Sequence, residues 1–126
     1  MNVIKEILTE TASIRKLEKG IIRIAIKDNA HLTAENLEEN FKAYVELMDE
    51  ETAPFLILVN DSASIDSAGR EEYNKKTRRE VRAKDALVIK SPATMLLINS
   101  QVKFIKPIIP TQAFLDEASA IRWLVS

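Results

Sequence analysis

The chain has 126 residues, 46% of them hydrophobic and 29% charged, and its 18 lysines and arginines nearly balance 19 aspartates and glutamates. This composition predicts one globular domain over residues 1–126 and argues against disorder or a strongly charged polymer as partner. With no cysteine, one histidine and two glycines, the sequence lacks the residues for disulfides, thiolate catalysis, zinc sites and glycine-rich phosphate loops. We therefore expect no metal and no cofactor.

The apolar segments of the chain are all short. The first ten residues carry Lys5, Glu6 and Glu10 among their aliphatic side chains, which interrupts the apolar region that a secretory signal needs. No window approaches the roughly 18 uninterrupted apolar residues of a membrane-spanning helix. The sequence therefore predicts a cytoplasmic protein with no membrane span.

The first half of the chain predicts a hairpin, a helix and a buried strand. Residues 11–17 and 21–27 alternate apolar and polar side chains, as the two strands of a β-hairpin do. Thr33 is suited to cap a helix that runs to about Glu51, since apolar residues recur after it at helical spacing. The wholly apolar run over 55–59 is typical of a central strand that is buried on both faces.

The second half of the chain predicts further alternation of helices and strands. Ser67 is placed to cap a second helix that ends near Arg82. The later elements are a strand, a third helix, a last strand and a closing helix, over residues 86–89, 93–105, 111–115 and from the cap Asp116 onward. This order predicts a mixed α/β sheet of about five strands with about four helices, in which the N-terminal hairpin is antiparallel and the other strands are mostly parallel.

Two segments carry a resemblance to a known family. The run FLILVND over 55–61, followed by IDSAG over 65–69 and a helix, resembles the central part of STAS domains, the anti-sigma-factor antagonist (SpoIIAA-like) family. In that family a serine in an Asp-Ser-Ser-Gly stretch is phosphorylated by a partner kinase, so the resemblance implies Ser67 as phosphoacceptor. The ending, FLDEA over 114–118 and IRWL over 121–124, is similar to that of uncharacterised bacterial STAS-like proteins.

The sequence departs from the family pattern just after this serine. Ala68 replaces the second serine, and charged residues over 70–72 stand where the family usually has apolar ones. From the residues alone, Ser67 is interpreted as a helix cap and Asp66 as a turn residue. Phosphorylation of Ser67 stays as the alternative.

A polar loop follows the central strand and is the best-placed small site. Asp61, Asp66 and Ser67 stand where open α/β sheets bind ligands, beside a helix N-terminus, so they form a candidate phosphoacceptor or anion-binding loop. The two carboxylates could hold a cation, but turn chemistry is favoured and we predict no metal site. A catalytic set of Ser67, His31 and Asp61 lacks a nucleophile elbow, so we predict no catalytic residue and no role for His31.

Charge is unevenly distributed between two predicted helices. Residues 33–51 hold seven acids and one lysine, whereas residues 70–84 hold seven bases and three acids. A basic helix can follow nucleic-acid phosphates, but the aromatic residues that would stack on bases are missing. We therefore predict a solvated helix face, with docking of a protein partner as the second interpretation and no nucleic acid.

The third predicted helix has more apolar residues than one sheet face can cover. Leu96, Leu97 and Phe104 form a second apolar stripe on it. The last strand and helix cover this stripe, or else it is a protein interface or the wall of a ligand cleft.

Taken together, these features predict a non-enzymatic protein-binding domain that forms a homodimer through the second stripe. A bacterial regulatory role is what the resemblance implies. The alternative is a carrier or sensor of an apolar small molecule, bound in a cleft beside the third helix, since STAS-like domains resemble the lipid-binding CRAL/TRIO fold.

Overall fold

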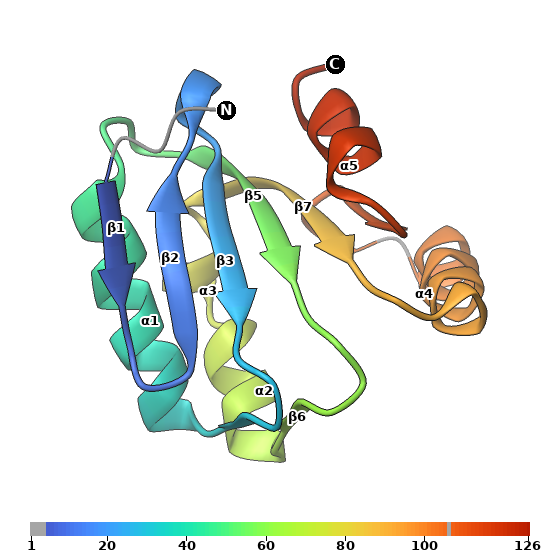
Figure 1. Cartoon of the computed structure of the whole chain (residues 1–126), viewed down its shortest axis with the longest axis horizontal. Helices are drawn as coiled ribbons and strands as arrows, with labels where there is room; N and C mark the ends of the chain where they lie inside the picture. The colour runs from blue at the N-terminus through green and yellow to red at the C-terminus, as the bar shows by residue number, and fades with distance from the viewer. Residues whose placement is uncertain (1–4, 106) are drawn as a thin grey trace.

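The computed structural model of the protein describes residues 5–105 and 107–126, without the side chains of residues 104 and 105. Its centre is a six-stranded sheet in the order β1-β2-β3-β5-β7-β8 (Figure 1). The strands are β1 (Lys5–Leu8), β2 (Ala12–Lys16), β3 (Ile22–Ile26), β5 (Ala53–Leu58), β7 (Arg82–Val88) and β8 (Thr111–Phe114). The β1–β2 and β2–β3 pairs are antiparallel and the remaining pairs are parallel, which confirms the predicted mixed sheet.

Helices flank the sheet, and a second ladder links two of its loops. The helices are α1 (Ala34–Leu47), α2 (Ser67–Tyr73), α3 (Lys76–Arg79), α4 (Pro92–Ile105) and α5 (Glu117–Leu124), with a short 3-10 turn η1 (Glu18–Gly20) between β2 and β3. Two short strands, β4 (His31–Leu32) and β6 (Ser64–Ile65), pair in parallel. Figure 1 shows α4 at the far side of the molecule from α1 and α2.

The core has two halves because neighbouring residues of β5 point to opposite faces of the sheet. Phe55 packs beneath α1, and its ring meets the edge of the Tyr44 ring with the centroids 4.8 Å apart. Leu56 packs on the other face against Ala86 and Ala120, whose small side chains let α5 approach the sheet. The first two residues of the apolar run are therefore buried on opposite faces, whereas Ile57, Leu58 and Val59 are only half-buried.

Two helix caps confirm the sequence prediction. The Thr33 hydroxyl accepts the Asn36 N–H at the start of α1, and the Asp116 carboxylate accepts the Ser119 N–H at the start of α5. The first helix ends at Leu47 rather than near residue 51. The three residues over 49–51 are all acidic, which opposes the negative end of the helix dipole.

The sequence prediction was wrong at three other places. It missed β1, an edge strand with mostly exposed side chains, and it missed the β4–β6 ladder. The predicted helix from residue 67 to 82 is broken into α2 and α3. Its last residue, Arg82, instead begins β7, where its buried side chain pairs with Asp85.

Candidate functional site

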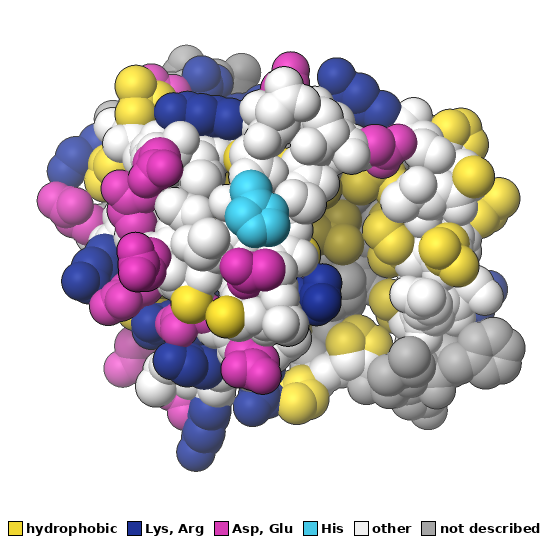
Figure 2. Space-filling model, turned by 90° about the horizontal axis from the view of Figure 1, so that it is seen from below, with side chains coloured by type: hydrophobic (Ala, Val, Ile, Leu, Met, Phe, Trp, Pro, Cys, Tyr) yellow, Lys and Arg dark blue, Asp and Glu magenta, His cyan; other side chains and the backbone are white. Residues whose placement is uncertain are grey.

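A cleft opens beside α2. It lies on the same face of the sheet as α1, which covers another part of that face. Its apolar floor is formed by side chains of β3, β5 and β7, including Ile24, Ile57 and Leu87. Pro107, Ile108 and Ile109, which follow α4, form part of the opposite wall. The cleft has a volume of ≈ 1050 Å³, and Figure 2 shows it as a hollow lined by hydrophobic side chains.

Helix α4 lies along the edge strand β8 and is held there by one polar side chain. The Asn99 amide accepts the Ala113 N–H at 2.8 Å and donates to the Ala113 carbonyl at 3.1 Å. These are the main-chain groups that a further strand would pair with. Over residues 92–103 no side chain of α4 is fully buried. The two hydrogen bonds of Asn99 are therefore important for holding α4 at its place beside β8.

Replacing Asn99 with alanine should therefore loosen α4 more than the rest of the fold. The variant loses two hydrogen bonds, each worth about 0.5–1.5 kcal/mol, and leaves the Ala113 groups without these partners. We expect faster hydrogen exchange across α4 and unchanged exchange in α1. Ser100→Ala, at the next and exposed position, is the control. Equal protection of α4 in both variants would contradict this anchoring role.

The predicted second apolar stripe lies on α4. Leu96 and Leu97 are 66% and 59% exposed, so the last strand and helix leave both leucines in solvent. The third member, Phe104, has its side chain outside the described residues. The lining of the cleft comes from another part of this wall, Gln101 and the segment 107–109.

A buried ion pair lies at the amino end of β7 and lines the cleft. The Asp85 Oδ2 atom accepts hydrogen bonds from the Tyr73 hydroxyl at 2.9 Å and from Arg82 Nε at 3.1 Å. The Arg82 guanidinium also stacks over the Tyr73 ring. Asp85 Oδ1 is buried without a partner among the described residues. Burial raises the pKa of the Asp85 carboxyl, although Arg82 and Tyr73 oppose this shift.

A second buried carboxylate ties α2 to α3 and α1. Glu72 is buried and pairs with Lys75 at 2.8 Å and with Arg78 at 2.6 Å. The hydrogen bond from Lys75 lowers the pKa of Glu72, with Arg78 adding to the effect. The Arg78 guanidinium also lies over the Phe41 ring of α1, 3.9 Å from its centroid. The prediction of a solvated basic face is therefore wrong for Arg78 and Arg82, whose charges neutralise buried acids.

The structure divides the predicted polar loop into two places. Asp61 lines a small pocket of ≈ 400 Å³ at the carboxyl ends of the strands, where Lys90 and Asp28 also lie. Asp66 and Ser67 stand instead at the start of α2. The three residues therefore do not surround one common anion site.

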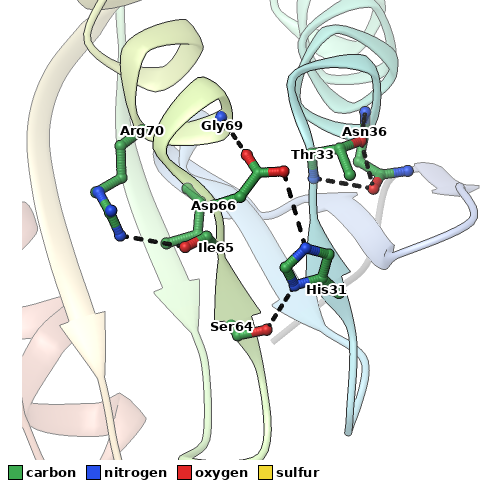
Figure 3. A network of polar contacts seen from close by, with 8 residues as sticks. All are labelled: His31, Thr33, Asn36, Ser64, Ile65, Asp66, Gly69 and Arg70. Atoms are coloured by element: carbon green, nitrogen blue, oxygen red, sulfur yellow. Dashed lines mark hydrogen bonds and ion pairs between the residues drawn. The ribbon is translucent and has the colours of Figure 1, made fainter.

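His31 joins a cluster other than the one considered from the sequence. Its Nδ1 atom lies 2.8 Å from the Ser64 hydroxyl oxygen, and its Nε2 atom lies 3.8 Å from Asp66 Oδ2 (Figure 3). The second distance is too long for a hydrogen bond. The cluster links the β4–β6 ladder to the start of α2, and neither Ser67 nor Asp61 is part of it.

The cap of α2 corrects the sequence prediction by one residue. Asp66, not Ser67, is the N-cap, because its Oδ1 atom accepts the Gly69 N–H at 2.7 Å. Ser67 is the first residue of the helix and is exposed. Aspartate and serine both favour N-cap positions, so local sequence preference does not distinguish Asp66 from Ser67 as the cap.

Substitution of these two residues should distinguish their roles. Asp66→Ala should lower the free energy of unfolding by about 1 kcal/mol, because the Gly69 N–H loses its acceptor. Ser67→Ala should change it by less than about 0.5 kcal/mol, as is usual for an exposed position. Urea unfolding curves measure both values. The reverse ranking would restore Ser67 as the cap.

Comparisons with known proteins agree with this fold. The chain is similar to an uncharacterised protein of the DUF3478 family from Shewanella loihica PV-4, whose crystal structure is described as having a SpoIIAA-like fold. The two sequences are 13% identical, 98% of each chain is covered, and the TM-score is 0.65. This similarity confirms the STAS-like fold class that the sequence indicated.

The remaining findings concern membrane-spanning helices, curated relatives and the family of the chain. Within the part of the chain that the structure describes, no helix has the length and apolar character to cross a membrane. No curated protein matches the sequence. Residues 15–126 match the model of the family described as domain of unknown function DUF7793, and the chain therefore belongs to that family.

Proposed function

We propose that this protein is a non-enzymatic binding domain, and that it carries or senses an apolar small molecule in the cleft beside α2. The observation that supports this most is the cleft itself, with a volume of ≈ 1050 Å³ and an apolar floor. Small-molecule sites typically have volumes of about 300–1,000 Å³ and mostly apolar linings. The sequence left a carrier or sensor open as the alternative, with its cleft expected beside the third helix. The observed cleft lies beside α2 instead and favours the same class of function.

The energetics of the lining support the same proposal. Ile108 is 77% exposed, and Ile57 and Leu87 on the floor are only half-buried. Fully covering such a side chain stabilises it by about 1.5–3 kcal/mol relative to water. An apolar ligand would gain part of this free energy at each contact. The buried acids of the cleft already pair with arginines, which favours a role in shaping the cleft over a reaction there.

Titration with the uncharged fluorescent probe N-phenylnaphthylamine tests this proposal. We expect a saturable rise in probe fluorescence for the parent protein. Leu87→Trp should weaken binding at least about tenfold, because the larger ring occupies the space of the ligand. Leu8→Trp is the matched control, since Leu8 is exposed on β1 at the other edge of the sheet and should leave binding unchanged.

A second cleft variant distinguishes loss of probe binding from loss of the fold. Ile108→Glu alters an exposed residue that lines the cleft, so the domain should fold while probe binding falls. Absence of saturable binding by the parent would contradict the proposal. Equal probe affinities of the parent, both cleft variants and the control would contradict it as well.

Protein binding is the second candidate function, and the exposed leucines of α4 favour it. Leu96 and Leu97 lie side by side in sequence and are both mostly in solvent. A two-fold dimer could cover this patch with a second copy of itself. A regulatory role of the domain, with Ser67 as phosphoacceptor, belongs to this candidate because Ser67 is exposed.

Sedimentation of a lysine variant tests the dimer. We expect the parent to sediment as a dimer and Leu97→Lys as a folded monomer, because an ammonium group buried without a partner would oppose association. Leu8→Lys, at an equally exposed leucine on β1, should remain dimeric. A parent that is monomeric throughout the micromolar range would exclude this candidate.

A further inference from the structure

We infer that the ligand of the cleft is an amphiphile with a carboxylate end, and that Arg70 binds this end while Arg79 adds to the positive charge of the cleft. The inference rests on the proposed function, since it assumes that the apolar part of the molecule lies on the floor of the cleft. It adds the charge of the ligand and the residues that recognise it.

Positive charge exceeds negative charge among the described residues that line the cleft. The charged residues that line it are four arginines and two carboxylates, namely Arg70, Arg78, Arg79, Arg82, Glu72 and Asp85. Arg78 pairs with Glu72 and Arg82 pairs with Asp85, so both acids are engaged with arginines. Within the described part of the chain, the lining therefore carries two further arginines whose charges no acid of the lining neutralises.

The two remaining guanidinium groups donate to main-chain carbonyls. Arg70 Nη1 donates to the Ile65 carbonyl at 3.1 Å, and Arg79 Nε donates to the Asn74 carbonyl at 2.9 Å. Among the residues that the structure describes, no carboxylate lies within 4.0 Å of either group. Each guanidinium has five N–H donors, so several remain for a ligand on both arginines.

The position of Arg70 suits this role. Figure 3 shows its side chain leaving α2 on the side opposite to His31. Arg70 is exposed, and it lines the cleft together with the apolar residues Ile57 and Val59. A carboxylate on Arg70 would therefore leave its hydrocarbon chain beside apolar floor residues.

The chemistry of the guanidinium group selects the charge of the ligand. Guanidinium groups bind carboxylates through paired, charge-assisted hydrogen bonds, which are stronger than neutral ones. An amphiphile with an alcohol end would keep only the apolar contacts, and one with an ammonium end would be repelled.

Displacement of the bound fluorescent probe by three twelve-carbon amphiphiles tests the inference. In displacing N-phenylnaphthylamine, dodecanoate should show an affinity at least about tenfold higher than that of dodecanol, as expected for hydrogen bonds to charged groups. Dodecylamine should be the weakest. Added salt should weaken dodecanoate more than dodecanol, because part of its affinity is electrostatic.

Arginine variants assign the preference to residues. The double variant Arg70→Gln/Arg79→Gln should bind dodecanoate no more tightly than dodecanol, with dodecanol affinity unchanged. The double lysine variant at the same positions should keep part of the preference, because it keeps the charge. Arg122→Gln is the control, since Arg122 is exposed on α5, which packs on the opposite face of the sheet.

The outcomes separate this inference from the proposed function. Equal affinity of the parent for dodecanoate and dodecanol would overturn the inference and leave the apolar site in place. A preference that survives in the double glutamine variant would overturn the assignment to Arg70 and Arg79. Failure of all three amphiphiles and of the probe would contradict the proposed function itself. Binding to dodecanoate-containing vesicles without binding of monomeric dodecanoate would overturn the inference in favour of a membrane surface.

Discussion

Arg82→Met should lower the free energy of unfolding by about 3–5 kcal/mol, the usual effect of removing one partner of a buried ion pair. Arg82 and Asp85 are both buried, and Arg82 Nε lies 3.1 Å from Asp85 Oδ2. Without the guanidinium, the Tyr73 hydroxyl is the one side-chain donor to the Asp85 carboxylate that remains among the described residues. The loss therefore comes from the uncompensated charge that remains.

The pH dependence of this loss has a definite sign. Burial already raises the pKa of Asp85 in the folded protein, and removal of the guanidinium should raise it further. The folded variant then takes up a proton at a higher pH than its unfolded chain does, so acidification through this range favours its folded state. The difference in unfolding free energy between parent and variant should shrink as the pH falls.

Two controls make this prediction specific. Arg79→Met makes the same chemical change at a guanidinium bonded to a main-chain carbonyl, and it should cost less than about 1 kcal/mol. Arg82→Met/Asp85→Leu removes both charges and should recover much of the stability. An Arg82→Met variant as stable as the Arg79→Met control would contradict the account of the buried pair.

Arg78→Glu should be the second strongly destabilising change, at about 3 kcal/mol or more, since it removes one of the two cationic partners of the buried Glu72 and places a second carboxylate beside it. Glu72 is buried, and its Oε2 atom lies 2.6 Å from Arg78 Nη2. The new carboxylate would face Glu72, and the Phe41 ring would lose the guanidinium that lies over it. Lys75 alone would then compensate Glu72.

Urea unfolding measures this effect against a charge-matched control. Arg79→Glu introduces the same charge reversal at the next residue, which has a main-chain carbonyl as acceptor, and should cost much less. The contacts of Arg78 contradict the interpretation of residues 70–84 as one solvated basic face. An Arg78→Glu variant as stable as Arg79→Glu would restore it.

The sequence predicted well those features that depend on local pattern or on burial of a whole segment. The caps Thr33 and Asp116 are recognisable because the polar residue directly precedes an apolar period of 3.6. Phe55 and Leu56 at the start of the apolar run are buried on opposite faces because helices cover both sides of the sheet there. The order of elements then allowed few topologies other than the observed mixed sheet.

Features that depend on contacts between distant residues could not be read from the sequence in this way. The break between α2 and α3 and the early start of β7 accompany contacts such as the hydrogen bond from the Tyr73 hydroxyl to Asp85, which joins α2 to β7. The cleft exists because α4 is fixed at β8 through Asn99, away from α2. The second apolar stripe on α4 indicated an uncovered surface. For the arginines of the cleft, the sequence showed only that residues 70–84 are basic, and not that these arginines line a cleft.

Methyl NMR of the protein with N-phenylnaphthylamine tests the central claim most directly, because the aromatic probe shifts the signals of the methyl groups that it contacts. We expect saturable shifts at the cleft residues Ile57, Leu87 and Ile108, and no shifts at Leu124 in the core beneath α5. Shifts confined to Leu96 and Leu97 on the outer side of α4, or no shifts at all, would contradict it.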